Sequence, residues 1–429
     1  HYREAEQLLM AATDVTGRDE TLMAAREGVW MCSRVFNPIQ ATDALEAVAL
    51  QYRAAGRKRD DAFCAIRLVN LYSQQGLFDK AVHAYEEALS LCREDAVLVA
   101  AAHTALAYTH TYLGRPLVAL ELLEEARPVL AASDPFLHAV NLLTTLAASV
   151  WKTDLAGAHA FYGRLKQLSA VYLDIDLMAD IWLAYICCLE GSFRKARRVY
   201  RGVVDRERKL GRLSGGLTYL RIQGSIYFRC RYFKDLEGAR SDLKLFEELG
   251  SHIAGADSLK GLYQAWIALE EGNARDAHEL ILSAIPGLRR GIANRVPYAM
   301  NALAEASLMM GDHDSAGRTA RECVEWNERS GNADQLVWAL RNSAEADILR
   351  GALAEANRSL ARAHALARTM GMKPHVAGSL AAWGRLLARA GRPDKAVLCL
   401  ERSRRLWKEM GLAAMAKKTD LQRERLLNP

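Results

Sequence analysis

The stretch Tyr72-Ser73-Gln74-Gln75-Gly76-Leu77-Phe78-Asp79-Lys80-Ala81, continued by Tyr85 and Ala88, decides the fold of this 429-residue chain. Gly76 permits a tight turn, because glycine adopts positive φ without steric cost. Ala81 is small enough to let two helices approach closely. The apolar residues at 81, 85 and 88 lie three and four apart, as on one face of a helix. The stretch therefore predicts two helices joined at Gly76.

The same frame recurs along most of the chain. Its turn position is occupied by Gly76, Gly114, Thr153, Gly191, Arg231, Gly272, Gly311, Gly351 and Gly391. The steps between these positions are nearly equal, with a period of about 39 residues, which is typical of helical-repeat arrays. A second series lies about 20 residues after the turns, where left-handed C-terminal caps are expected: Gly211, Gly250, Gly291, Gly331, Gly371 and Gly411. Each period predicts a helical hairpin, and the hairpins stack side by side.

The frame resembles the tetratricopeptide repeat (TPR), most closely over residues 63–92 and then periodically over about residues 62–415. The resemblance implies an all-α, right-handed superhelical solenoid. The period exceeds the family's usual length of about 34 residues, because the second helix of each unit is longer. Units of this length are similar to the TPR arrays of bacterial signal-transduction ATPases and MalT-like regulators, although the chain carries no ATPase motif.

Three segments follow from this repeat. Residues 1–61 fit the frame poorly and predict irregular helices ending in a partial or capping unit. Residues 62–415 are expected to form an array of about nine hairpins, and residues 416–429 predict a polar last helix or tail. His1 already lies in an amphipathic helical pattern, so we expect the chain to be part of a longer protein.

Composition narrows the class further. Nine prolines are about 2% of the chain, against roughly 5% on average, which favours long helices with short turns. The eight cysteines contain no C-x-x-C pair and lie mostly in apolar helical pattern, which predicts reduced core thiols and a cytoplasmic protein. The longest apolar run, residues 181–189, is too short to span a bilayer, so we expect no membrane partner.

No motif for catalysis or for a cofactor was found. The sequence has no Gly-Lys pair and hence no Walker phosphate-binding loop. His103 and His110 share a helix face and are interpreted as packed histidines. Asp174, Asp176 and Asp180 are interpreted as charges that complement a helix N-terminus. The sequence therefore predicts a non-enzyme without a metal or other cofactor.

The resemblance also implies where a partner binds, because the first helix of each TPR unit lines the concave groove. Carried over position by position, the groove residues are Arg67, Asn70, Gln74, Tyr108, Tyr112, Trp182, Tyr185, Arg221, Tyr263, Trp266, Tyr298, Asn301, Trp338, Arg341, Asn342 and Arg385. Tyr, Trp and Arg dominate binding hot spots. The same aromatic residues also suit packing between adjacent helices, and both interpretations stay open.

Two functions remain for the sequence. The first is a protein- or peptide-binding scaffold, the sensor or assembly domain of a larger bacterial signalling protein, whose own upstream effector domain is a further candidate partner. The second is a helical-repeat RNA-binding protein. It is motivated by the formal charge of +6 and by a basic strip formed by Arg194, Lys195, Arg197, Arg198 and Arg201. The side chains at the groove positions differ in chemistry from unit to unit, which disfavours an RNA-binding mode in which each repeat recognises one base.

Overall fold

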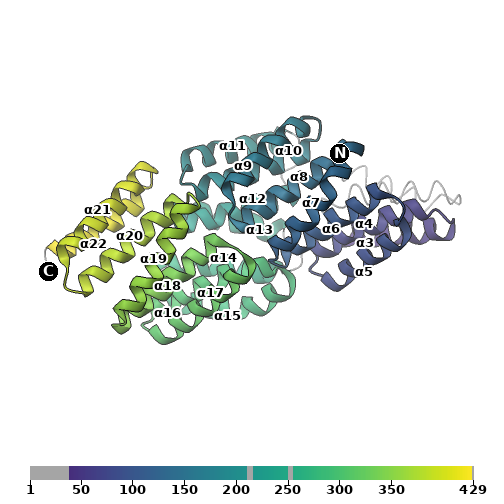
Figure 1. Cartoon of the computed structure of the whole chain (residues 1–429). Coiled ribbons are helices and arrows are strands. Elements are labelled where there is room, and N and C mark those ends of the chain that lie inside the picture. The colour runs from purple at the N-terminus through teal and green to yellow at the C-terminus, as the bar shows by residue number, and fades with distance from the viewer. Residues whose placement is uncertain (1–37, 210–215, 250–254, 428–429) are drawn as a thin grey trace.

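The computed structural model describes residues 38–209, 216–249 and 255–427, and all regular elements in these ranges are helices. Helices of an inner and an outer layer alternate along the chain (Figure 1). The inner helices are α4 (Lys58–Gln74), α6 (Ala96–Tyr112), α8 (Pro135–Lys152), α10 (Leu173–Leu189), α12 (Gly216–Phe228), α14 (Ala256–Glu271), α16 (Val296–Met309), α18 (Ala333–Arg350), α20 (Lys373–Arg389) and α22 (Ala413–Leu427). The predicted all-α repeat solenoid is confirmed.

Each outer helix packs on its inner neighbours in sequence. The outer helices are α3 (Pro38–Ala54), α5 (Phe78–Cys92), α7 (Pro116–Ser133), α9 (Leu155–Leu168), α11 (Phe193–Lys209), α13 (Leu236–Leu249), α15 (Ala274–Gly291), α17 (His313–Ser330), α19 (Leu353–Thr369) and α21 (Pro393–Glu409). The sequence explains the two layers. Inner helices such as α10 are apolar on most sides, whereas outer helices such as α11 carry charge on one face.

The turn positions behave largely as the repeat predicts. Gly76, Gly114, Gly191, Gly272, Gly311, Gly351 and Gly391 all have positive φ, and so does Thr153, which replaces glycine in its unit. In the second series, Gly331, Gly371 and Gly411 also have positive φ. Gly291 does not, because it is still part of α15 as the last residue of that helix. Gly211 and Gly250 lie outside the described residues.

One unit departs from the predicted register. Residues Arg229–Phe233 form a π-helical turn (η2) at the end of α12, and Lys234 has the positive φ (55°) that was expected at Arg231. The turn position is therefore shifted by three residues. This shift places Ala239, rather than Leu236, five residues after the turn. Ala239 is fully buried like its counterparts Ala81, Ala158 and Ala356, so the close helix contact is kept.

The superhelix is narrow enough that its successive turns touch. The Asp334 backbone N–H donates to Thr153 Oγ1 (3.0 Å), and the Asn294 side chain donates to the Thr111 carbonyl (3.0 Å). These pairs are 181 and 183 residues apart in sequence. Gly114 fits the contact, since a Cβ there would lie 3.4 Å from Asn294 Cα. The inner helices of the two halves therefore pack against each other across the axis.

The ends of the described chain continue the same pattern. At the N-terminal end, α3 packs on α4 as an outer helix, with a positive-φ turn at Gly56. The rest of the predicted capping segment, residues 1–37, lies outside the described residues. At the C-terminal end, α22 packs on α21 and covers most of the predicted polar segment.

Candidate partner-binding face

The middle of the predicted groove is filled by the protein's own aromatic side chains. Tyr185, Tyr263, Trp266 and Tyr298 are all buried. The Tyr185 and Tyr298 hydroxyls lie 2.7 Å apart, although α10 and α16 are far apart in sequence. This finding corrects the groove assignment of these four residues. They form a core across the superhelix axis, because the touching turns leave no open channel there.

Three polar groove candidates are also structural. The Asn342 side chain donates to the Asn301 carbonyl (3.1 Å), and the Asn301 side chain donates to the Gln335 carbonyl (3.1 Å). Both asparagines are buried and join neighbouring inner helices. Arg221 is buried against Glu207, with Nε 3.3 Å from Oε2. These three residues are therefore corrected to packing residues as well.

The N-terminal inner face keeps its predicted side chains within reach of solvent. Arg67, Asn70, Gln74, Tyr108 and Tyr112 are partly exposed. The Arg67 guanidinium lies 4.2 Å from the centre of the Phe63 ring, and the Tyr108 and Tyr112 hydroxyls are 3.0 Å apart. This part of the face offers aromatic and amide groups to a partner.

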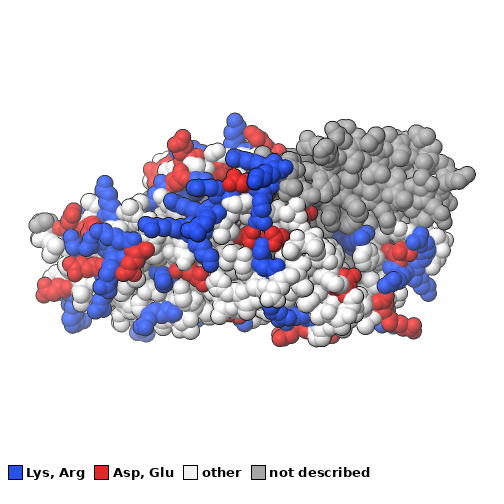
Figure 2. Space-filling view, turned by 90° about the horizontal axis from the view of Figure 1, so that it is seen from above, with Lys and Arg blue, Asp and Glu red and all other residues white. Residues whose placement is uncertain are grey.

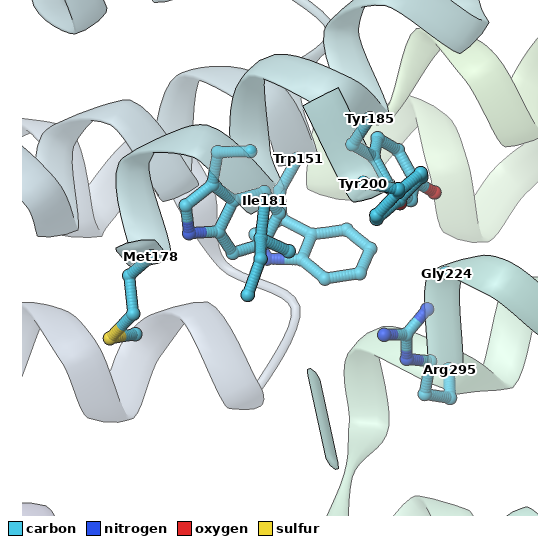
Figure 3. Close-up of a pocket in the computed structure, with 8 residues that line it drawn as sticks. Trp151, Met178, Ile181, Tyr185, Tyr200, Gly224 and Arg295 are labelled. Atoms are coloured by element: carbon cyan, nitrogen blue, oxygen red, sulfur yellow. The ribbon is translucent and has the colours of Figure 1, made fainter. Parts of the chain in front are cut away.

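An aromatic pocket opens between α8, α10, α11 and α12 (Figure 3). Its cavity volume is about 20 Å³, which is room for about one water molecule. Trp151, Trp182, Tyr185 and Tyr200 form its walls, and Arg295 lies opposite them. The Tyr200 hydroxyl is buried and makes no hydrogen bond within the described part of the chain, and burial raises its pKa. Of the groove candidates, Trp182 is the one that lines this pocket and stays partly exposed.

Among the described residues that line the pocket, Arg295 is the charged one. Its guanidinium lies 4.8 Å from the centre of the Trp151 ring and donates to Gln223 Oε1 at 2.6 Å. The sequence frame missed Arg295, because it lies in the short η4 turn (Ala293–Arg295) before α16 rather than at a groove position of a helix. Arg295 is itself buried, so it adds a positive charge to a pocket wall that is otherwise mostly aromatic and apolar.

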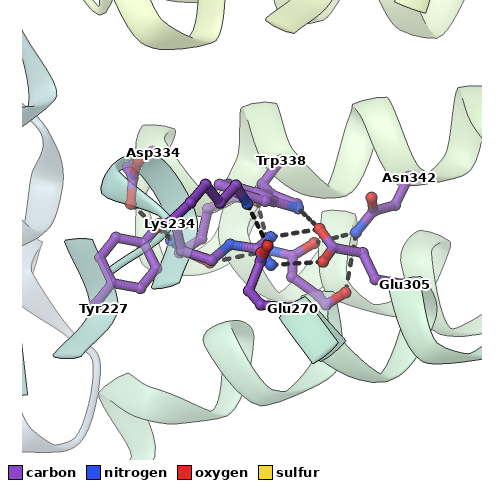
Figure 4. Close-up of polar contacts among 10 residues, drawn as sticks. Tyr227, Lys234, Glu270, Glu305, Asp334, Trp338 and Asn342 are labelled. Carbon is purple, nitrogen blue, oxygen red and sulfur yellow. Dashed lines mark hydrogen bonds and ion pairs between the residues drawn. The ribbon is translucent and has the colours of Figure 1, made fainter. Parts of the chain in front are cut away.

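The C-terminal half of the inner face carries a network of charged side chains (Figure 4). The Arg231 guanidinium donates to Glu305 (2.6 Å), which also accepts from the indole N–H of Trp338. Lys234 pairs with Glu270. Burial lowers the pKa of Arg231, but Glu305 outweighs this effect and the pKa is raised. Trp338 is thus corrected from a groove contact to a largely buried member of this network.

Arg341 and Arg385 are the groove candidates that stay partly exposed in this half. The Nε of Arg385 donates to both carboxylate oxygens of Glu345 at 3.0 Å. Arg341 lies over Trp338 and has no such carboxylate among the described residues.

The basic strip lies on the outer surface. Arg194, Lys195, Arg197, Arg198 and Arg201 are all exposed on α11, and Figure 2 shows basic side chains gathered over this part of the molecule. Within the described ranges, none of these five residues forms an ion pair. Arg206 of the same helix, by contrast, contacts Asp176 and Asp180, so both aspartates have a structural partner.

Two kinds of feature are absent from the part of the chain that the structure describes. Within residues 38–209, 216–249 and 255–427, no group of three His, Cys, Asp or Glu side chains could hold a metal ion. In the same ranges no helix is long and apolar enough to cross a membrane.

One family model and several solved structures are similar to this chain. Residues 61–132 match the family model described as tetratricopeptide repeat. The solved APC/C hetero-tetramer Cut9-Hcn1 is similar over 97% of this chain and 86% of that chain, with 11% identity and a TM-score of 0.51. A Rap protein complexed with Competence and Sporulation Factor is similar over 92% of this chain and 99% of that chain, with 10% identity and a TM-score of 0.43. Aspartyl phosphate phosphatase F from Bacillus subtilis is similar over 65% of this chain and 76% of that chain, with 14% identity and a TM-score of 0.37.

A comparison with curated protein sequences gives no match. Residues 61–132 therefore match the tetratricopeptide repeat, and the described chain has the fold of an all-α helical-repeat solenoid.

Proposed function

We propose that this scaffold is non-catalytic and binds a protein or peptide partner on the open parts of its inner face. The observation that carries the proposal is the pocket beside Trp182, where aromatic walls meet the Arg295 guanidinium. Trp, Tyr and Arg are enriched at the energetic centre of protein interfaces. The pocket itself holds about one water molecule, so a peptide would lay an apolar side chain over its mouth, beside the exposed part of Trp182.

The binding array in this proposal is residues 62–415, with residues 1–61 as a cap and 416–429 as a polar end. Its context is a larger bacterial signalling or regulatory protein in the cytoplasm, in which the array acts as the sensor or assembly domain. An effector domain of the same protein is a candidate occupant alongside a separate partner. The resemblance to long-repeat regulators supports this context.

Site-specific photo-crosslinking tests the proposal. A photoreactive phenylalanine at position 182 should capture a peptide or protein from native lysate, because this side chain lines the pocket and is partly exposed. The control carries the same group at Val171, which is 79% exposed and away from the pocket lining. Equal capture at both positions would contradict a binding role for the pocket.

The basic strip supports RNA binding as the second candidate. Five exposed cations on one face of α11 could follow a phosphate backbone, and their binding would weaken steeply with salt. Nuclease treatment separates the two functions. Capture that survives nuclease and is lost in Trp182→Ala supports the protein partner, whereas nuclease-sensitive capture that is lost on removing the strip supports RNA.

A further inference from the structure

Arg341 is a charged side chain of the inner face without a counter-ion. In the described part of the chain its guanidinium makes no hydrogen bond or ion pair, and its Nε is buried without an acceptor. Its one recorded partner is the Trp338 ring, whose centre lies 5.4 Å from the guanidinium carbon. Burial and the nearby Arg385 lower its pKa, so its surroundings disfavour the cation.

The carboxylates near Arg341 are already engaged. Glu305 binds Arg231 and the Trp338 indole N–H, and Glu345 binds Arg385 through three hydrogen bonds. Three arginines therefore face two carboxylates around Trp338, and one positive charge is left uncompensated. A poorly hydrated charge without a partner is costly for a protein, and groups perturbed in this way cluster at functional sites.

The fold places Arg341 where a ligand can reach it. Asp334, Trp338, Arg341 and Glu345 follow each other at spacings of four, three and four residues, so they share one face of α18. Trp338 of this face lies against Arg231 of η2, with the guanidinium carbon 3.7 Å from the ring centre, and Glu345 binds Arg385 of α20, so the face is turned toward neighbouring inner elements. Arg341 is nevertheless partly exposed.

Gly378 on α20 makes room for the guanidinium. A Cβ at this position would lie only 2.5 Å from Arg341 Nη1, so any larger residue would displace the side chain. The neighbouring helix is thus shaped to hold Arg341 in place without offering it an acceptor.

From this arrangement we infer that Arg341 is the anchor of a carboxylate-binding site on the inner face of α18 and α20, which takes an acidic group of the peptide partner. This inference deepens the proposed function and rests on it. A carboxylate fits better than a phosphate monoester, because one uncompensated guanidinium balances one negative charge and pairs with two carboxylate oxygens. A free small dicarboxylic acid would supply the same chemistry.

Paired peptide arrays test the site on the full chain. Each random hexapeptide with a free C-terminal carboxylate is matched by its C-terminal amide, and each Glu-containing peptide by its Gln counterpart. Glutarate, titrated alone in a thermal-shift assay, tests the free small acid. The variants are Arg341→Met, which removes the charge at similar length, and Arg350→Met, which makes the same change in net charge on the outer side of α18, where Arg350 pairs with Asp347 and Asp314.

We expect wild type and Arg350→Met to bind carboxylate peptides about tenfold or more tightly than the neutral counterparts, and Arg341→Met to lose this preference. If glutarate raises the melting temperature of wild type but not of Arg341→Met, and no peptide binds, the carboxylate-binding site is supported and the peptide partner is contradicted. If acidic and neutral peptides bind equally, and this binding is unchanged in Arg341→Met but lost in Trp182→Ala, the carboxylate-binding site is contradicted and the proposed function is supported. If neither the peptides nor glutarate bind, both the carboxylate-binding site and the proposed function are contradicted.

Melting temperatures test whether Arg341 has only a structural role. Arg341→Met should melt at or above the wild-type temperature, because it removes a charge that has no partner in the described part of the protein. Arg385→Met should melt lower, because it leaves Glu345 unpaired. A comparable loss in both variants would mean that Arg341 has a structural counter-ion, and the inference would fall.

Discussion

Replacing Trp266 with alanine tests whether the superhelix axis is filled by packed side chains or forms an open groove. Trp266 lies on α14 and is only 2% exposed. Its ring centre is 5.1 Å from Tyr227, 5.4 Å from Tyr263 and 6.3 Å from Tyr298. A buried aromatic side chain removes roughly 150–250 Å² from water, which at about 25 cal/mol per Å² is an upper estimate of roughly 4–6 kcal/mol. Measured Trp→Ala substitutions in cores cost about 3–5 kcal/mol.

We therefore expect Trp266→Ala to lower the free energy of unfolding by about 4 kcal/mol. Urea titration followed by circular dichroism at 222 nm measures this loss, with the slope compared as well because repeat arrays can unfold in stages. Trp182→Ala is the matched control, since Trp182 is partly exposed at the pocket and should cost clearly less. A loss below about 1 kcal/mol in Trp266→Ala, no larger than in the control, would refute the packed axis.

Three further predictions concern stability. Ala356→Trp should cost on the order of 1–3 kcal/mol or more by overpacking the hairpin contact, because Ala356 is fully buried; an unchanged melting curve would contradict the repeat register. Gly351→Ala should cost about 1–2 kcal/mol through its positive φ alone, since a Cβ there meets nothing within 4 Å, whereas Gly163→Ala in α9 should not destabilise. Burial raises the pKa of Asp176, but hydrogen bonds from Lys166 and Arg206 outweigh it and lower the pKa below its usual value. The unfolded value is about 3.9, so this carboxylate stabilises the fold above about pH 4 and loses that effect as the pH falls further. Thermal melts between pH 3 and 6 should show a shallower acid loss in Asp176→Asn, and an unchanged slope would contradict the ion pairs.

The sequence was sufficient to predict the helical hairpins, because each depends on local features of one period. A positive-φ turn, a small residue five positions later and an amphipathic outer helix all fall within a single unit. The exceptions also have local causes. The π-helical turn before Lys234 adds residues that the glycine frame does not contain. Gly291 is the last residue of α15, and the cap after it is Ile292, with a φ of −149°.

The inner face was predicted less well, because its exposure depends on superhelical pitch. Small rotations between successive hairpins add up along the array, and their sum decides whether Tyr298 faces an open groove or meets Tyr185 across the axis. No single period of the sequence determines that sum. Residue type adds little, since Trp and Tyr suit packing and binding equally. Arg341 and Arg385 stay partly exposed, because a long charged side chain retains some contact with water, and their role in a groove stays a prediction.

The contacts between Thr153 and Asp334 and between Thr111 and Asn294 alter how this array can evolve and fold. In an ordinary stack each unit meets only its neighbours, so a unit can be inserted or deleted with a local effect. Here the removal of one unit between residues 153 and 334 would bring different side chains together at every cross-turn contact after it. The number of units in this segment is therefore fixed by the geometry. Links over about 180 residues also raise contact order, so the segment should fold more slowly and more cooperatively than a linear stack of equal length.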